Sequence, residues 1–327
     1  MIGQGVAMDP CNHSVLYWGN TPYDATYGGL FKTTNAGGSW TRIGLVDATQ
    51  MVDMPLKIRV DPSNSQHLFV GDGVRGATQG LWESTDGGAH FVKPAGWIKA
   101  GQDIGAYIDD VYDIAIDPSD FKHMLVTSHG PWAWDSAAYG RAAGVMETKD
   151  GGKTWIAHKP ILSWGTGHAI YFLYDPQKGI GNNQTWLLAT QADGQWRTSD
   201  AGQNWTRVAP QDIAHGGGTH YYSKTGVLYM AATPRILRST DNGLSFTEVG
   251  DSIGYRAVWG DGTYLYIGQA GGHGPQPFSR SPEADGITWT PFGQSIDDNG
   301  PYEMLFDDVN KLLYASNWSQ GLWVYKP

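Results

Sequence analysis

Residues Ser239–Phe246 read STDNGLSF, and near-copies of this octapeptide return along the chain. The copies are TTNAGGSW (Thr33–Trp40), STDGGAHF (Ser84–Phe91), TKDGGKTW (Thr148–Trp155), TSDAGQNW (Thr198–Trp205) and, with one extra residue, SPEADGITW (Ser281–Trp289). The shared pattern is Ser/Thr-x-Asp-x-Gly-x-x-aromatic. Its Asp or Asn side chain can accept hydrogen bonds from the backbone amides of a turn, and its Gly supplies a positive φ. The pattern predicts a repeated tight turn followed by an aromatic core residue.

A short strand precedes each turn, and two further strands around a second turn lie upstream. These strand pairs are VAMDPCNHSVLYWG, IRVDPSNSQHLFVG, IAIDPSDFKHMLVT, YFLYDPQKGIGNNQTWLLAT, HYYSKTGVLYMAA, AVWGDGTYLYIG and MLFDDVNKLLYAS. Seven such units in 327 residues predict an all-β fold, a seven-bladed β-propeller with four-stranded antiparallel blades. We expect a single domain over residues 1–327. We also expect the ring to close by pairing one terminal segment with the other terminal blade.

The composition agrees with this fold and excludes several kinds of partner. The chain has 45 Gly and 15 Trp, as expected for Gly-rich turns between short aromatic strands. Its formal net charge of -10 argues against a nucleic-acid partner, which would require a basic surface. No stretch approaches 18 consecutive apolar residues, so we expect no membrane partner. Cys11 is the single cysteine, so no internal disulfide can form.

The repeated turns resemble the Asp-box (BNR) repeats of sialidases, xyloglucanases and sortilin-like propellers. This resemblance covers nearly the whole chain. It is more specific for fold than for function, because the same box occurs in hydrolases, lyases and non-enzymes. In such propellers the box joins the two outer strands on the face away from the ligand. We therefore expect the boxes to be scaffold and the functional site to lie at the opposite mouth of the central channel.

Two sets of positions should line that mouth. Counting four residues back from the Asp-Pro turn predicts a ring of channel-facing residues, namely Gly5, Lys57, Asp113, Tyr171, Thr219, Arg256 and Glu303. The other set comes from the starts of the innermost strands and from the loops after the second strands. It includes Gln4, Asp53, Asp72, Arg75, Asp110, His129, Trp132, Trp134, His168, His215, His220, Tyr255, Tyr302 and Trp318.

Each of these residue types suits a step in carbohydrate chemistry. Since His titrates near neutrality and suits proton transfer, the catalytic candidates are His129, His168, His215, His220 and the adjacent Tyr221. Cations would neutralise a substrate carboxylate, and Trp132 and Trp134 would stack on sugar rings. The substrate-binding candidates are Lys57, Arg59, Asp72, Arg75, Asp110, Asp113, Trp132, Trp134, Tyr171, Arg256, Glu303 and Trp318.

Three functions are compatible with this mouth. The favoured one is a polysaccharide lyase acting on a uronate glycan by β-elimination, because His, Tyr and Arg supply the acid, the base and the carboxylate partner. In architecture the chain is similar to ulvan lyases and rhamnose–glucuronate lyases. The first alternative is a glycoside hydrolase, which needs two carboxylates roughly 5–10 Å apart. Xyloglucanases usually carry two propellers in a longer chain, which counts against them here. The second alternative is a non-catalytic propeller that binds a glycan or a protein.

The remaining expectations concern cofactors, partners and location. No Cys/His zinc spacing is present, so we expect no required cofactor and no metal in the site. A structural Ca²⁺ could bind near SIDDN (Ser295–Asn299). We expect a polysaccharide or oligosaccharide partner, a monomer, and an extracellular or periplasmic location reached through a signal peptide that this chain lacks.

Overall fold

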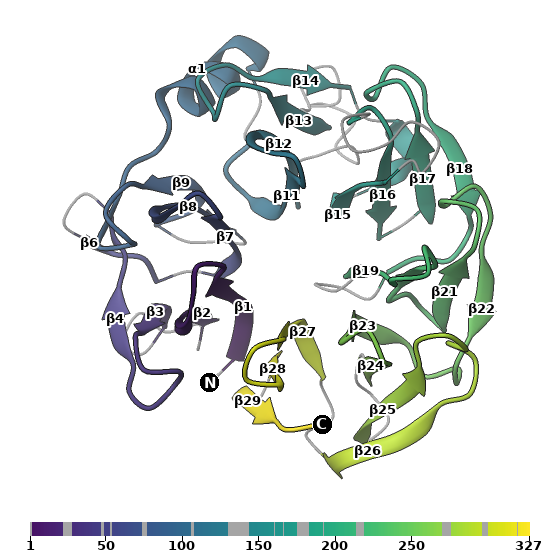
Figure 1. Cartoon of the computed structure of the whole chain (residues 1–327). Helices are drawn as coiled ribbons and strands as arrows, with labels where there is room; N and C mark the ends of the chain where they lie inside the picture. Colours follow the sequence, from purple (N-terminus) through teal and green to yellow (C-terminus); the bar gives the residue numbers. More distant parts are fainter. Residues whose placement is uncertain are drawn as a thin grey trace.

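The structure, a computed structural model, is a ring of seven β-sheets around a central axis (Figure 1). Each sheet is one blade, with its first strand nearest the axis and its last strand at the rim. The predicted β-propeller is confirmed. The structure describes residues 2–21, 28–46, 49–52, 54–73, 77–105, 108–129, 144–159, 161–165, 167–174, 183–191, 193–213, 219–269, 276–295, 300–318 and 320–327.

The blades follow one another in chain order, and neighbouring strands within a blade are antiparallel. Blade one contains β1 (Ile2–Asp9), β2 (Asn12–Thr21), β3 (Gly29–Thr33) and β4 (Thr41–Ile43). Blade two contains β7 (Pro55–Asp61), β8 (Asn64–Asp72) and β9 (Gly80–Ser84), and Val92 bridges to Glu83 at its outer edge. Blade three contains β11 (Val111–Asp117), β12 (Asp120–Ser128), β13 (Val145–Thr148) and β14 (Ile156–His158).

The other four blades complete the ring. Blade four contains β15 (Gly167–Phe172), β16 (Trp186–Thr190), β17 (Gln195–Thr198) and β18 (Thr206–Ala209). Blade five contains β19 (His220–Tyr222), β20 (Leu228–Met230), β21 (Ile236–Ser239) and β22 (Thr247–Val249). Blade six contains β23 (Tyr255–Gly260), β24 (Tyr264–Gln269), β25 (Pro277–Pro282) and β26 (Thr290–Ser295). Blade seven contains β27 (Pro301–Asp307), β28 (Leu312–Asn317) and β29 (Gly321–Tyr325).

Five further elements lie at the rim and in the connections. β5 (Leu45–Val46) pairs with β6 (Thr49–Gln50) and, in parallel, with β10 (His90–Phe91), which joins blades one and two. The helix α1 (Ala95–Ile104) follows blade two, and a 3₁₀ helix (Leu162–Trp164) precedes blade four. In the described part of the chain, no helix has the length and apolar character needed to cross a membrane.

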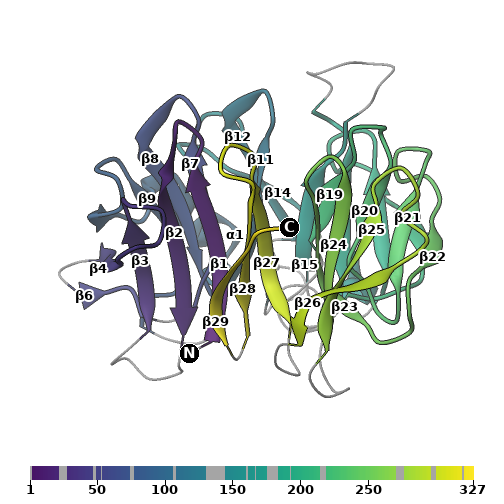
Figure 2. The same ribbon diagram turned by 60° about the horizontal axis from the view of Figure 1, so that its bottom comes forward.

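The ring closes differently from our expectation. Among the described residues blade seven has three strands, and β1 pairs only with β2, so the predicted exchange of a terminal strand is wrong. β1 and β27 instead pack side by side (Figures 1 and 2). Side chains make the link, because Trp18 Nε1 donates to Ser316 Oγ at 3.0 Å and the Val6 amide donates to Glu303 Oε2 at 3.2 Å.

The repeated turns are held by side-chain hydrogen bonds. In blade five, Ser239 Oγ donates to Asp241 Oδ1 at 2.7 Å and accepts the Gly243 amide at 2.9 Å, while the Ser245 amide donates to Asp241 Oδ1 at 2.9 Å. The turns join third to fourth strands, so antiparallel connectivity places them at the opposite end of the blade from the start of the innermost strand. This agrees with a scaffolding role.

Each turn also contributes to the packing between blades. The aromatic residue that ends the turn of one blade shares a core cluster with an apolar residue on the fourth strand of the preceding blade. The pairs are Ile43 with Phe91, Ala209 with Phe246, and Val249 with Trp289. The aromatic position of the repeat is therefore a contact between neighbouring blades.

We predict that Asp241→Ala lowers the free energy of unfolding by about 1–2 kcal/mol, because the Ser245 amide and the Ser239 hydroxyl lose their shared acceptor. Urea denaturation would measure the change. Asp103→Ala on the exposed surface of α1 is the matched control, with an expected change within about 0.5 kcal/mol. Equal effects of the two substitutions would contradict the role given to the turn.

A buried carboxylate in blade three gives stability a pH dependence. Glu147 is buried, with Oε1 2.8 Å from His123 Nε2 and Oε2 2.9 Å from His158 Nε2. Burial raises the pKa of Glu147, but hydrogen bonds from His123 and His158 and the charge of Lys149 outweigh it and lower the pKa to about 2. In the unfolded chain the pKa returns toward 4.5. The folded state therefore loses stability as the pH falls from about 4.5 to about 2.

Glu147→Gln should remove this part of the pH dependence, since Gln does not titrate. We expect a smaller fall in melting temperature between pH 5 and pH 2 (about the window set by the two pKa values) for the variant than for the parent protein. Thermal unfolding followed by circular dichroism would show it. Asp103→Asn is the control and should leave the pH profile unchanged, and identical profiles for Glu147→Gln and the parent would refute the assignment.

Candidate functional site

A β-bulge recurs near the start of the innermost strands and decides which side chains reach the channel. Pairing registers shift between Pro55 and Lys57, Val111 and Asp113, and Pro301 and Glu303, and at the corresponding points of blades one, four and six. A bulge adds an unpaired residue and redirects the side chains beside it. Lys57, Asp113 and Glu303 each follow the bulge directly.

The pairing registers correct two members of the predicted ring. The registers place Ala169 and Ala257 at the position of Lys57 in blades four and six. Tyr171 corresponds instead to Arg59, two residues further along the strand, and Arg256 is itself the bulged residue. In blade six, Ala257 stands four residues before Asp261, whereas Arg256 stands five residues before it. In blade four the connection is longer, so the count from Asp175 gives Tyr171 instead of Ala169.

Four charged side chains of the predicted site meet near the axis. Lys57 Nζ lies 3.9 Å from Asp113 Oδ1 and 3.5 Å from Glu303 Oε1. Arg59 lies 3.4 Å from each of the same two carboxylates. The exposed fractions of the four side chains range from 8% to 26%, so their attraction is only partly screened by water. We call Lys57, Arg59, Asp113 and Glu303 the axial charge cluster.

Ring residues also pair with the exposed inner edges of neighbouring blades. An innermost strand leaves backbone groups on its inner side without a sheet partner. The Asp113 carboxylate accepts the Ile170 amide at 3.0 Å, and Thr219 Oγ1 accepts the Val258 amide at 2.8 Å. With the bond from Val6 to Glu303, side chains from blades three, five and seven thus each hold the first strand of the next blade.

His220 lies deep between blades four and five. Its ring stacks on Tyr171 with centroids 4.5 Å apart, and its side chain has no hydrogen-bond partner at Nε2 within the described residues. Burial and the positive charge of Lys57 lower the pKa of His220 to about 3. Burial raises the pKa of Tyr171 to about 12. His220 is therefore neutral near pH 7 and does not carry the proton that a general acid would deliver.

A cluster of apolar and aromatic side chains lies at the mouth opposite the repeated turns. Met54, Leu56, Tyr112 and Tyr302 are buried together, and half-buried Trp318 packs against them. Tyr302 and Trp318 are stacked, with centroids 4.8 Å apart. The Arg256 guanidinium lies 4.9 Å from the Tyr302 centroid and 5.4 Å from that of Trp318. We call Met54, Leu56, Tyr112, Tyr302 and Trp318 the aromatic floor.

His129 and Asp110 lie beside the aromatic floor. His129 stacks on Tyr112 with centroids 5.2 Å apart, and its Nδ1 is 3.2 Å from Asp110 Oδ2. Sequence reasoning predicted His129, Asp110 and Trp318 at the mouth and overlooked Met54, Leu56 and Tyr112. Two of the overlooked residues could have been found from the sequence, because Leu56 and Tyr112, like Tyr302, stand five residues before the Asp of the turn.

Two other candidates have structural partners elsewhere. Asp72 is buried, and its carboxylate accepts the Met54 amide at 2.5 Å and the Thr78 hydroxyl at 2.7 Å, which fixes two loops. Tyr221 donates to Glu283 Oε2 at 3.1 Å, just beyond the third strand of blade six. Burial and the Glu283 charge raise the pKa of Tyr221. Since Glu283 begins the turn after that strand, Tyr221 points away from the aromatic floor.

Several predicted residues lie outside the described part of the chain. Arg75, Trp132, Trp134, His215 and Asp53 belong to this group, as does most of the Ser295–Asn299 segment proposed for Ca²⁺. His168 lies in β15, but its side chain is not described.

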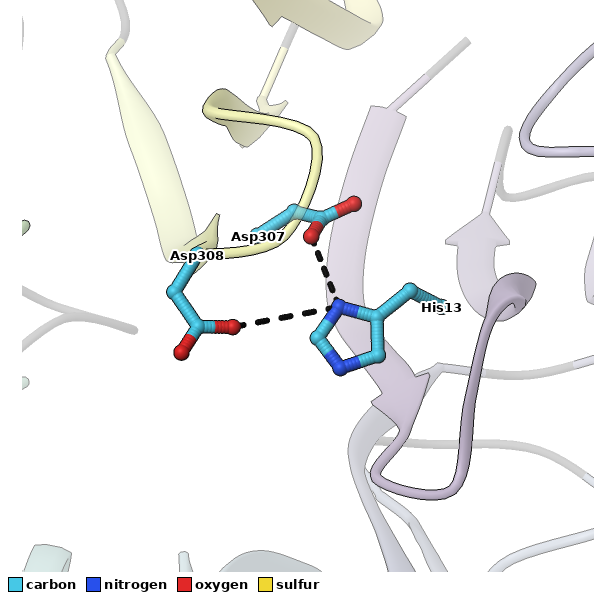
Figure 3. Close-up of side chains that lie close together, drawn as sticks. All are labelled: His13, Asp307 and Asp308. Carbon is cyan, nitrogen blue, oxygen red and sulfur yellow. Dashed lines mark hydrogen bonds and ion pairs between the residues drawn. The ribbon is translucent and has the colours of Figure 1, made fainter.

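One group in the described residues has the composition of a metal site. His13, Asp307 and Asp308 bring their ligand atoms within 4.8 Å of one another, with His13 Nδ1 2.7 Å from Asp307 Oδ1 and 3.9 Å from Asp308 Oδ1 (Figure 3). Asp307 Oδ1 also accepts the amides of Val309 and Asn310 at 3.0 Å. These bonds explain the group as a link between blades one and seven, and we assign it no metal.

Comparison with curated proteins finds two xyloglucanases of similar sequence. The chain is 26% identical over 284 residues to a xyloglucanase of Hypocrea jecorina, covering 75% of this chain and 32% of that protein. It is 22% identical over 310 residues to a xyloglucanase of Paenibacillus sp., covering 88% of this chain and 28% of that protein. The chain thus spans about a third of the length of these relatives. No protein-family model matches it.

A solved structure supports the fold. The GH74 xyloglucanase of Xanthomonas campestris superposes over 100% of this chain and 52% of its own, with a TM-score of 0.70 and 16% identity. At that identity the likeness concerns the fold alone.

These relatives overturn the favoured function. They are xyloglucanases, which are glycoside hydrolases, so the predicted polysaccharide lyase is wrong and our first alternative is favoured. The geometry supplies a physical reason. Lys57 and Arg59 already pair with Asp113 and Glu303, so they do not offer an uncompensated charge to a substrate carboxylate.

We predict that Glu303→Gln lowers the free energy of unfolding by about 3 kcal/mol, because two mostly buried cations then share the single carboxylate of Asp113. Glu248→Gln is the matched control, since Glu248 is more exposed and lies 3.7 Å from Arg235. Its expected change is below about 1 kcal/mol. Urea denaturation would compare the two, and a Glu303→Gln change no larger than the control would show that the cluster does not stabilise the ring.

Proposed function

We propose that this propeller binds a neutral polysaccharide of the xyloglucan type on the aromatic floor and takes part in hydrolysis of its glycosidic bonds. The observation that carries the proposal is the similarity to two xyloglucanases, which extends over 75% and 88% of this chain. The chain covers only about a third of either relative, so their activity enters here as an inference.

The aromatic floor suits an uncharged sugar. Pyranose rings present apolar faces that stack on aromatic side chains, and Trp318 is partly exposed to receive one. Tyr302 stacks on the Trp318 ring and the Arg256 guanidinium contacts it, and a ring held in this way loses less entropy when a sugar binds. The balanced charge of the axial cluster favours a neutral glycan over a uronate.

Hydrolysis needs a pair of carboxylates, and we assign one of them to Asp110. Asp113 and Glu303 are engaged by Lys57 and Arg59, and Asp72 is engaged by a backbone amide and a hydroxyl. The Asp110 carboxylate lies 3.2 Å from Nδ1 of His129, and histidine is a residue type that suits proton transfer. Its position beside Tyr112 would bring it close to a sugar bound on the aromatic floor.

We also propose a location, an oligomeric state and a cofactor requirement for the protein. A polysaccharide does not cross membranes, so we place the action outside the cytoplasm. We further propose that the propeller acts as a monomer and that hydrolysis requires no cofactor, because carboxylates supply both proton-transfer roles.

The direct test incubates the purified chain with xyloglucan, measuring new reducing ends and, separately, retention in affinity electrophoresis. Retention together with reducing ends supports the proposal. Retention without cleavage would refute hydrolysis by this chain and leave a glycan-binding propeller. Neither signal would refute the whole proposal.

Two substitutions test the assigned residues. Trp318→Ala should weaken xyloglucan binding about tenfold, since stacking contributes about 1.4 kcal/mol. Asp110→Asn should reduce the rate of reducing-end release by at least about 100-fold while binding persists. Tyr174→Ala, an exposed aromatic beyond the other end of β15, is the matched control and should change neither quantity. A Trp318→Ala variant with unchanged affinity would exclude the aromatic floor as the binding surface.

A further inference from the structure

The connection from blade two to blade three contains α1, which is the only α-helix among the described residues. It begins after the outer edge of blade two, lies at the rim of the ring (Figure 1), and ends shortly before β11, the innermost strand of blade three. Asp109 and Asp110 directly precede β11 at the mouth. The helix is therefore close in sequence to Asp110, the carboxylate that we assign to hydrolysis.

Asp109 ties this connection to both α1 and blade two. Its Oδ1 accepts the indole N–H of Trp97 at 2.9 Å, and its Oδ2 lies 2.7 Å from Lys93 Nζ. The Asp109 and Lys93 side chains are 25% and 22% exposed. Water and salt therefore screen their attraction less than that of Lys99 and Asp103 on the same helix, which are 72% and 60% exposed. Both oxygens of Asp109 are thus held, by donors from two different elements.

The two donors are themselves fixed by packing. Trp97 is 1% exposed and packs edge-on against Trp155 of blade three, with ring centroids 4.9 Å apart. Lys93 Nζ lies 5.1 Å from the centroid of the Trp82 ring and donates to the Gln79 carbonyl at 3.3 Å. Asp109 is therefore anchored to the packed parts of blades two and three.

The anchor acts on Asp110 through the backbone. The Val111 amide donates to the Asp109 carbonyl at 2.8 Å, so Asp110 is the central residue of a three-residue turn. The Asp110 carbonyl accepts the His129 amide at 2.8 Å, and the Asp110 carboxylate lies 3.2 Å from His129 Nδ1. A shift of the Asp109 peptide group would therefore turn the Asp110 side chain relative to His129.

The other side of Asp110 offers little room. The Gly73 backbone approaches so closely that a β-carbon on Gly73 would lie 3.3 Å from Asp110 Oδ1 and 2.2 Å from the Val111 oxygen. The Gly73 amide donates to the carbonyl of Met54 at 3.1 Å, and Met54 belongs to the aromatic floor. Asp110 thus has a defined orientation beside the aromatic floor.

We propose that Asp109 is a positioning residue for hydrolysis and that Trp97 and Lys93 hold it in place. The inference rests on the proposed function, in which Asp110 is one of the two carboxylates, and Asp109 acts only through the orientation of Asp110. A carboxylate must lie within hydrogen-bonding reach of the group with which it exchanges a proton, and a misplacement of about 1 Å can lower the rate about 100-fold. Loss of the anchor should therefore slow the chemical step and leave xyloglucan binding unchanged.

The experiment compares Trp97→Phe with Trp155→Phe. Each substitution keeps an aromatic ring and removes one indole N–H, from the bond to Asp109 in the first case and from the bond to the Gly152 carbonyl in the second. We expect Trp97→Phe to lower kcat for release of reducing ends from xyloglucan at least about tenfold at unchanged KM. Trp155→Phe should stay within about twofold of the parent protein. Equal falls in kcat for the two variants, or a change confined to KM, would overturn the proposal.

A second variant guards against a folding defect, which urea denaturation would reveal. Lys93→Met keeps the apolar stem of a partly exposed side chain and removes the charge that faces Asp109. It should lower kcat at least about threefold at unchanged KM, since Asp109 then keeps only its bond to Trp97. If Trp97→Phe does not fold, Lys93→Met is compared with Trp155→Phe on the same criteria.

Nuclear magnetic resonance separates this inference from the proposed function, because it does not require hydrolysis. The His129 ring lies beside the Asp110 carboxylate, so its signals should shift in Trp97→Phe and Lys93→Met and stay unchanged in Trp155→Phe. A parent protein that releases no reducing ends would refute the proposed function, while the spectra would still decide whether Asp109 orients Asp110. Unchanged His129 signals in both anchor variants would overturn the inference, whether or not the parent protein is active.

Discussion

The ring depends on a balance of charge at its axis. Lys57 and Arg59 from one blade meet Asp113 and Glu303 from two others, and the two carboxylates also accept amides from blades four and one. Each ionic group is mostly buried, so each needs a partner to offset its lost hydration. The cluster therefore fixes five blades relative to one another. Within the cluster, Lys57 and Arg59 are already paired with carboxylates and so offer no uncompensated charge to an acidic substrate.

The fold could be predicted from sequence because its signal is local and repeated. The Asp of each turn binds amides within four residues, so STDNGLSF and its copies report a turn without knowledge of the rest of the chain. The candidate site was harder, since it depends on register. The pairing registers place Ala257 instead of Arg256, and Ala169 instead of Tyr171, at the position of Lys57. In blade four the connection after β15 is longer, so a count along the sequence does not give the register.

The predicted site residues divide in the same way. Trp318, His129 and Asp110 were predicted from their position at strand ends, and the structure places them around one surface. Tyr221 was predicted from its neighbour His220, but successive residues of a strand point to opposite faces of the sheet. The Tyr221 side chain therefore contacts Glu283 of blade six, whereas the His220 ring packs on Tyr171 of blade four. The pKa of His220 could not be anticipated either, because it follows from burial and from Lys57, which lies far away in sequence.

The junction of blades one and seven has a mechanical consequence. At the six other junctions the polypeptide passes from one blade to the next, so separating those blades strains a covalent connection. At this junction only contacts such as Trp18 with Ser316 and His13 with Asp307 oppose separation. Partial unfolding begins where the fewest interactions must break. The junction of blades one and seven is thus the place where the ring is held by contacts between side chains instead of a chain connection, and the Glu303 carboxylate contributes to it by accepting the Val6 amide.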